Sequence, residues 1–137
     1  MKILIADDED YTREGLIESV SWEEYDIDEI MQAVNGLEAI GIAKWFRPDI
    51  ILTDVRMPKI DGIEFATEVL NWNPGSRIIF MSGYMEIEYL KSAIRLAAID
   101  YIEKPIDADV LCQALRKAVD EIKSSRRNIE AVQTSIA

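Results

Sequence analysis

Short apolar runs alternate along the chain with segments whose apolar residues follow a helical spacing. The apolar runs are rich in Ile, Leu and Val, which is typical of strands that are buried on both faces. In the intervening segments, apolar residues gather on one side of a helix, as Leu16, Ile17 and Val20 do. Turn signals, such as Asn35-Gly36, separate the two kinds of segment. The pattern therefore predicts alternating strands and helices.

The predicted elements are five strands and five helices in strict alternation. The alternation and the apolar character of the strands predict a parallel sheet with helices on both faces and right-handed crossovers. We therefore predict an α/β fold, a doubly wound (βα)5 three-layer sandwich. The strands are expected near residues 2–7, 29–34, 49–54, 77–82 and 99–103, and the helices near residues 12–20, 37–46, 61–71, 86–97 and from 107 onward.

The composition favours a single folded domain and excludes several functions. With 137 residues, of which 49% are hydrophobic, the chain can form a sizeable core. We expect neither a membrane span nor a signal peptide, and a cytoplasmic location, because no apolar run is long enough and the chain opens on a charged strand. Cys112 is the only cysteine, so an internal disulfide is excluded. The lack of histidine disfavours the usual zinc sites and excludes Ser-His-Asp catalysis.

The chain is strongly acidic, with a formal net charge of -11. A surface of this sign repels nucleic acid, so we do not expect the chain to bind DNA by itself. Part of the charge lies in the segment SWEEYDIDE at residues 21–29, which is expected to be a solvated acidic loop.

Charged residues stand at the C-terminal ends of three predicted strands. Asp54 ends the third strand, Asp7 and Asp8 end the first, and Lys104 follows the last. Ligands bind at this edge of open α/β sheets. If the first and third strands are neighbours, three carboxylates converge, and a hard divalent cation such as Mg²⁺ relieves their repulsion. An ionised Asp54 can then attack phosphorus and form an acyl phosphate, with the metal and Lys104 neutralising the transferring oxygens.

Each residue alone also has an ordinary structural explanation. Acidic residues such as Asp7 and Asp10 favour the N-terminus of the helix that follows, and a single lysine such as Lys104 is most often a surface residue. Their joint occurrence at the ends of several strands, in the expected order, favours a common site.

Five motifs stand in a fixed order along the chain. They are ILIADDE at residues 3–9, DIILTDVRMP at 49–58, Asp61-Gly62, MSG at 81–83 and DYIEKP at 100–105. Taken together, these motifs resemble the receiver domain of two-component response regulators. The resemblance implies a flavodoxin-like sheet of order 2-1-3-4-5 and a receiver domain over residues 1–122.

The resemblance implies an acceptor and a metal site. Asp54 would accept a phosphoryl group from a histidine kinase in the presence of Mg²⁺ or Mn²⁺. The metal ligands would be Asp7, Asp8, Asp54 and the backbone carbonyl of Arg56. Phosphotransfer and autodephosphorylation would be self-catalysed, so the chain is not expected to be an enzyme in the ordinary sense.

The resemblance also implies a switch. Ser82 and Lys104 would bind the phosphoryl group, Tyr101 would be the aromatic switch residue, and Lys104-Pro105 would be a cis peptide. Movement of Ser82 and Tyr101 would change the surface formed by the fourth helix, the fifth strand and the fifth helix.

Two flanking residues are expected to set the lifetime of the acyl phosphate. Arg56 lies two residues after Asp54, and Tyr84 lies two residues after Ser82. In the family these positions tune phosphate loss, and their bulk predicts a longer lifetime here. Arg56 also disfavours the alternative of a Mg-dependent aspartyl-phosphate phosphohydrolase, because such enzymes usually carry a second aspartate at that position.

Residues 123–137 are expected to be a linker or a helical extension toward a missing output domain. A heptad pattern predicts a coiled coil and a homodimer on activation, whereas the polar stretch after Ile122 also fits a flexible linker. The positions of the pattern are Leu115, Ile122, Ile129 and Ile136, with Ala118, Ser125 and Val132 between them.

The region around Asp54 and the loop containing Trp22 are similar to those of receivers that carry an AraC-type helix-turn-helix output domain. The chain is therefore predicted to control a transcription regulator and to reach DNA only through that missing domain. A free-standing phosphorelay receiver is the alternative.

Overall fold

The computed structural model describes residues 1–136, with side chains through residue 133, and contains one parallel sheet of order β2-β1-β3-β4-β5. This confirms the predicted α/β fold and strand order, and predicted boundaries differ by one or two residues. The strands are β1 (Lys2–Ala6), β2 (Glu29–Ala33), β3 (Ile50–Asp54), β4 (Arg77–Ser82) and β5 (Asp100–Glu103). The helices are α1 (Asp10–Ser19), the 3-10 helix η1 (Trp22–Tyr25), α2 (Gly36–Phe46), α3 (Gly62–Trp72), α4 (Ile87–Arg95) and α5 (Ala108–Ile136).

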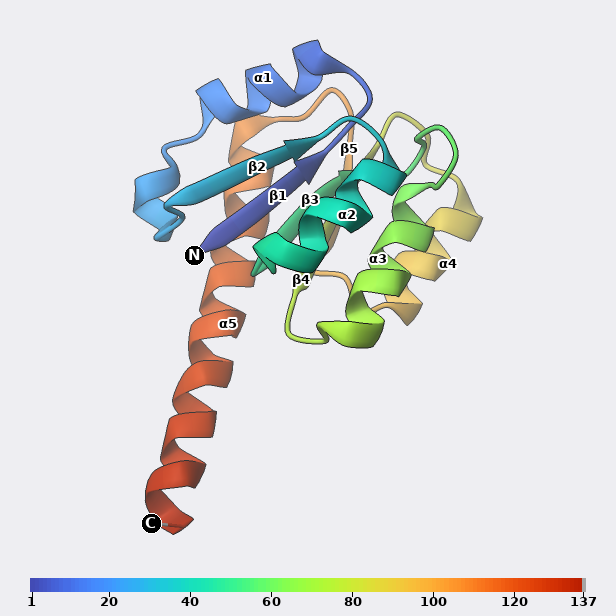
Figure 1. Cartoon of the computed structure of the whole chain (residues 1–137). Helices are drawn as coiled ribbons and strands as arrows, with labels where there is room; N and C mark the ends of the chain where they lie inside the picture. Colours follow the sequence, from blue (N-terminus) through green and yellow to red (C-terminus); the bar gives the residue numbers. More distant parts are fainter. Residues whose placement is uncertain (137) are drawn as a thin grey trace.

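The helices cover both faces of the sheet (Figure 1), with α1 and α5 on one face and α2, α3 and α4 on the other. Alternate residues of β1 supply the two cores, since Ile3 and Ile5 face the α1 and α5 side and Leu4 faces the other. Every residue of the central strand β3 is buried, whereas the edge strand β2 exposes Glu29 and Gln32. Burial on both faces explains why β3 reads as an uninterrupted apolar run.

The acidic segment at residues 21–29 is not the solvated loop that its composition predicts. Trp22 and Tyr25 of η1 and the following Ile27 are buried in the core shared with α1 and α5. The indole Nε1 of Trp22 donates a hydrogen bond to the Ile17 carbonyl at 2.9 Å. The prediction was wrong because the acidic residues form only the outer surface, while the apolar residues between them fix the segment to the core.

Helix α5 is continuous over 29 residues and extends beyond the sheet (Figure 1). The heptad positions Leu115 and Ile122 are buried against the sheet, whereas Ile129 and Val132 are 55% and 58% exposed. Residues after Ile122 therefore continue the helix, and the side chain of position 136 lies outside the described residues. No helix in the described part of the chain is both long enough and apolar enough to cross a bilayer.

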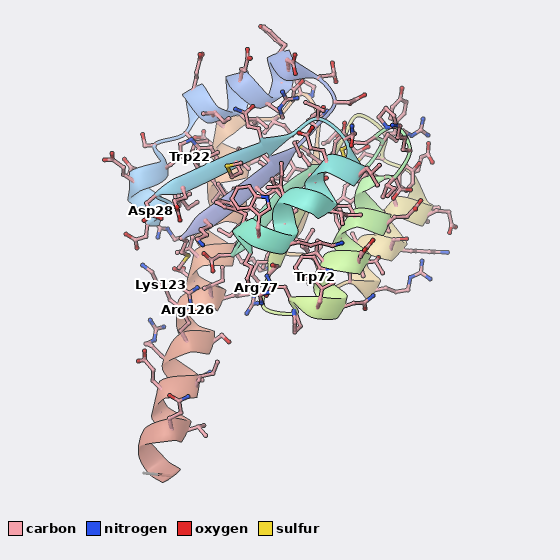
Figure 2. All side chains as sticks on the ribbon, viewed as in Figure 1. Trp22, Asp28, Trp72, Arg77, Lys123 and Arg126 are labelled. Atoms are coloured by element: carbon pink, nitrogen blue, oxygen red, sulfur yellow. The ribbon has the colours of Figure 1, made fainter. Side chains whose placement is uncertain are left out.

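Ion pairs surround α5 where it leaves the domain (Figure 2). They come from three separate parts of the domain, so the direction of the projecting helix is tied to the sheet. The pairs are Lys123 with Asp26, Arg126 with Asp49 at 2.7 Å, and Glu121 with Arg77 at 3.3 Å.

Candidate functional site

Three carboxylates meet at the C-terminal edge of the sheet. Asp7 directly follows β1 and Asp54 ends β3, and these two strands are paired in parallel. Together with Asp8, each offers an oxygen that lies within 4.8 Å of the others. Asp7 and Asp54 are buried and Asp8 is exposed. The fold thus brings together the three acidic residues expected to share a site.

Lys104 extends from the end of β5 into this acidic cluster. Its Nζ lies 2.7 Å from Asp7 Oδ2 and 3.0 Å from Asp54 Oδ2, and 3.6 Å from Glu9 Oε1. The backbone N–H of Lys104 donates to the Ser82 carbonyl at 2.8 Å. The Lys104–Pro105 peptide, which the resemblance implies to be cis, is cis in the structure. One cation therefore bridges the ends of three strands.

The charges of the site are unevenly balanced. Burial raises the pKa of Asp54, although the hydrogen bond from Lys104 acts in the opposite direction. Partial burial and then the charge of Asp7 raise the pKa of Asp8, which is otherwise exposed. Burial alone would lower the pKa of Lys104, but its hydrogen bonds with Asp7 and Asp54 outweigh burial and raise it. The single charge of Lys104 does not balance the three carboxylates, so repulsion among them remains. This set of hard oxygen donors fits Mg²⁺.

A glycine allows helix α3 to start directly beside the end of β3. Gly62 N–H donates to the Val55 carbonyl at 2.8 Å, and a Cβ at position 62 would lie 2.1 Å from the Asp54 carbonyl oxygen. Asp61 caps α3 by accepting a hydrogen bond from Glu64 N–H at 2.8 Å. This tight return closes the loop that carries Arg56 over the site.

Ser82 and Tyr101 share one backbone group. The Ser82 hydroxyl donates to the Tyr84 carbonyl and accepts from the Tyr84 N–H, both at 3.0 Å. The Tyr101 hydroxyl donates to the same Tyr84 carbonyl at 3.0 Å. Burial raises the pKa of Tyr101, so it remains a hydrogen-bond donor at neutral pH. The two residues expected to form a switch are thus connected through the loop between β4 and α4.

Arg56 and Tyr84 are in direct contact. The Arg56 guanidinium lies 4.0 Å from the centre of the Tyr84 ring and 5.7 Å from the centre of the Tyr89 ring. It also forms an ion pair with Glu86. The sequence pointed to Arg56 and Tyr84 but gave no indication of Glu86 and Tyr89, because the contact depends on how two separate loops meet.

A cavity of about 210 Å³ opens above the acidic cluster. Its wall combines the carboxylates with Lys104 and with the Arg56 and Tyr84 pair. The lining residues are Asp8, Glu9, Asp54, Arg56, Gly83, Tyr84 and Lys104.

Arg13 is a further residue of the site that sequence reasoning missed. Its buried guanidinium donates to the Asp7 carbonyl at 2.6 Å, to Gln32 Oε1 at 3.1 Å and to Asp10 Oδ1 at 2.5 Å. A cation near the start of a helix is disfavoured by the helix dipole. That unusual position was the signal in the sequence that Arg13 has specific partners.

Comparisons with known proteins agree with this architecture. Residues 3–116 match the family model of the response regulator receiver domain. The crystal structure of a two-component transcriptional regulator AraC from Clostridium phytofermentans is 45% identical and covers 92% of this chain and 98% of that chain, with a TM-score of 0.86. The REC domain of AraT, a response regulator from Geobacillus stearothermophilus, is 34% identical and covers 91% and 97%, with a TM-score of 0.85.

Among curated proteins, the transcriptional regulatory protein HptR from Staphylococcus aureus is 33% identical over 106 residues. The match covers 77% of this chain and 41% of HptR. An uncharacterized response regulatory protein from Staphylococcus epidermidis is 34% identical over 121 residues, covering 83% of this chain and 47% of that protein. The chain thus spans less than half the length of these relatives.

Proposed function

Because this chain belongs to the response regulator receiver domain family, we propose that it receives a phosphoryl group from a histidine kinase on Asp54. The observation that carries the proposal is the position of Asp54 within hydrogen-bonding distance of Lys104 and beside Asp7 and Asp8. A receiver of a two-component system requires this arrangement of an acceptor, a cation and metal ligands.

The reaction is a displacement at phosphorus. An Asp54 carboxylate oxygen attacks the phosphohistidine of the kinase, the P–N bond breaks, and the histidine nitrogen leaves with the electron pair. Lys104 neutralises part of the charge on the transferring oxygens. Mg²⁺ or Mn²⁺, held by Asp7, Asp8, Asp54 and the Arg56 carbonyl, would supply further positive charge to these oxygens. The same groups support self-catalysed hydrolysis of the acyl phosphate.

The switch is a biased equilibrium between two arrangements. Phosphoryl oxygens on Asp54 draw the Ser82 hydroxyl away from the Tyr84 backbone, and the Tyr101 side chain adjusts with it. The surface formed by α4, β5 and α5 then changes. The population shifts only to the extent that the phosphoryl group binds one arrangement better than the other.

We assign the output to a transcription regulator in the cytoplasm. The chain spans less than half of HptR, which is named a transcriptional regulatory protein, and it is similar to the receiver of a regulator named AraC. DNA binding is assigned to an output domain of that kind, since the receiver itself has a formal net charge of -11.

The direct test is mass spectrometry after incubation with a small-molecule phosphodonor and Mg²⁺. Wild type should gain one phosphoryl group and then stop, whereas Asp54→Asn should gain none. Unchanged uptake by Asp54→Asn would refute the acceptor assignment. Release of inorganic phosphate over many turnovers without accumulation of the phosphorylated protein would instead support a phosphohydrolase.

We further propose that Arg56 and Tyr84 lengthen the life of the acyl phosphate. Their stacked side chains line the cavity that an attacking water must enter. Replacing both by Ala should accelerate phosphate loss by about tenfold, or ~1.4 kcal/mol in the barrier. The half-life can be followed by mass spectrometry after the donor is removed. An unchanged half-life, at full initial phosphorylation, would disprove the shielding role.

A further inference from the structure

Glu86 ties the phosphoacceptor site to the start of helix α4. It occupies the N-cap position of α4, but among the described residues its side chain makes no capping hydrogen bond. Its carboxylate instead forms an ion pair with Arg56 from the loop after β3. A side chain placed to cap its own helix is thus used to hold a residue of the acidic site.

The guanidinium of Arg56 is held on several sides. It lies over the Tyr84 ring at 4.0 Å, and Tyr89 from the first turn of α4 lies at 5.7 Å. The Tyr89 hydroxyl and the charge of Glu86 together outweigh the effect of burial and raise the pKa of Arg56. Loop and helix therefore position one permanent cation at the mouth of the cavity.

Arg56 also contacts the acceptor directly. Its backbone N–H donates to Asp54 Oδ1 at 3.4 Å, and its side chain lines the same cavity as Asp54 and Lys104. A phosphoryl group in that cavity would carry close to two negative charges. Guanidinium groups bind phosphate oxygens in a bidentate manner.

The Glu86 carboxylate and the phosphoryl group on Asp54 would then compete for the Arg56 guanidinium. The side chains of Arg56 and Glu86 are 45% and 46% exposed, and ion pairs exposed to this degree are weak. A doubly charged group on the largely buried Asp54 is the stronger competitor.

We propose that Glu86 is a positioning residue that competes with the phosphoryl group for Arg56, so that phosphorylation releases the first turn of α4 from the acidic site. This inference rests on the proposed phosphorylation of Asp54. Its structural consequence is a second connection to α4, which runs through Glu86 and meets the one through Ser82 and Tyr101 at Tyr84. The helix that it releases carries the exposed apolar residues Ile87 and Ile94.

The proposal can be tested with beryllofluoride, which binds a carboxylate as a phosphoryl group does, at saturating Mg²⁺. Glu86→Gln keeps the size of the side chain and removes the competing charge. It should tighten beryllofluoride binding, measured by ¹⁹F NMR, by about threefold, as expected for the loss of one exposed ion pair. The matched control is Glu88→Gln, which removes the same charge two residues further along the chain. The Glu88 carboxylate lies 3.9 Å from Lys91 Nζ. The control should leave the affinity unchanged.

A double-mutant cycle separates competition from simple repulsion. In an Arg56→Gln background, Glu86→Gln should have no effect on beryllofluoride binding. An equal gain with and without Arg56 would overturn the proposal, since Glu86 would then act on the phosphoryl group through space. Equal affinities of wild type and Glu86→Gln would also overturn it.

Amide hydrogen exchange provides the second readout. Exchange in the first turn of α4 should be faster in Glu86→Gln than in wild type without ligand, and beryllofluoride should accelerate it in wild type. Release of the helix would be contradicted if neither Glu86→Gln nor beryllofluoride changed the exchange rates of these amides. If wild type bound no beryllofluoride at all, the proposed function itself would fail, an outcome that is distinct from a failed cycle.

Discussion

The guanidinium of Arg13 connects the acidic site with strand β2 and helix α1 through three hydrogen bonds. One of these reaches the backbone carbonyl of Asp7, so the cation fixes the turn that presents Asp7 and Asp8. A buried cation with several partners is costly to remove, because the partners are left unsatisfied.

Arg13→Met should therefore lower the free energy of unfolding by about 2–3 kcal/mol, measured by urea denaturation. The methionine keeps the aliphatic contacts and removes the hydrogen bonds together with the charge that pairs with Asp10. The matched variant is Arg95→Met, since Arg95 is exposed on α4 and, within the described part of the chain, its guanidinium donates only to the Ser92 hydroxyl. Similar losses for the two variants would show that Arg13 has no special role.

Single residues differ in how far the sequence reveals them. Asp54 and Lys104 could be predicted because Asp54 ends β3 and Lys104 directly follows β5, and parallel strands bring their ends to one edge. Arg13 and Glu86 could not, because their partners come from other elements and the contacts depend on the packing of side chains. The sequence indicated the positions of Arg56 and Tyr84, but neither the stacking of their side chains nor the ion pair of Arg56 with Glu86.

Whole elements were predicted where burial leaves a periodic signal. The strand β3 and the helices that cover the sheet follow this signal closely. The 3-10 helix η1 does not, because three buried residues, Trp22, Tyr25 and Ile27, are separated by acidic ones within a short segment. A segment of that length carries too few apolar positions to distinguish an anchored turn from a solvated loop.

The projecting part of α5 exposes apolar side chains that are not buried against the described part of the domain. Its exposed Ile129 and Val132 continue the heptad register of the buried Leu115 and Ile122. Isolated helices of this length are marginal in water, so a second copy of the helix would stabilise it. We therefore propose that α5 forms the dimer contact of the phosphorylated receiver.

Ile129→Asp with Val132→Asp should abolish a dimer that wild type forms in the presence of phosphodonor and Mg²⁺, as measured by analytical ultracentrifugation. A dimer of this variant would have to bury the two new aspartate charges between the paired helices, which is energetically costly. The control, Ser124→Asp with Ala131→Asp, places the same charges outside the seam and should retain the dimer. A wild type that stays monomeric at all concentrations, with and without phosphodonor, would contradict the proposal.

The excess of acidic residues over the whole molecule leads us to expect a stability that depends on divalent cations. The formal net charge is -11, and Asp7 and Asp8 stand side by side at the sheet edge with Asp54. Partial burial and the charge of Asp7 raise the pKa of Asp8, so folding disfavours the ionised form of this carboxyl group. The fold therefore bears an electrostatic cost at neutral pH, when this carboxylate is ionised.

Mg²⁺ should raise the melting temperature of wild type by several degrees, and Asp8→Asn should remove most of that response. Without divalent cations, Asp8→Asn should be as stable as wild type or more so, by a few tenths of a kcal/mol, since solvent screens an exposed carboxylate. Scanning calorimetry with Mg²⁺ and with a chelator would measure both effects. A variant that responds to Mg²⁺ as wild type does would place the cation elsewhere.

The length of α5 has a mechanical consequence. The helix begins near the edge of the sheet that holds Lys104 and passes beyond the opposite edge (Figure 1). At 1.5 Å per residue its 29 residues measure about 44 Å. The 14 residues after Ile122 measure about 21 Å, so a tilt of about 5° of this projecting part alone would carry its far end through about 2 Å. The projecting helix would thus act as a lever arm, because a rotation too small to disturb the core grows into a larger displacement toward residue 136.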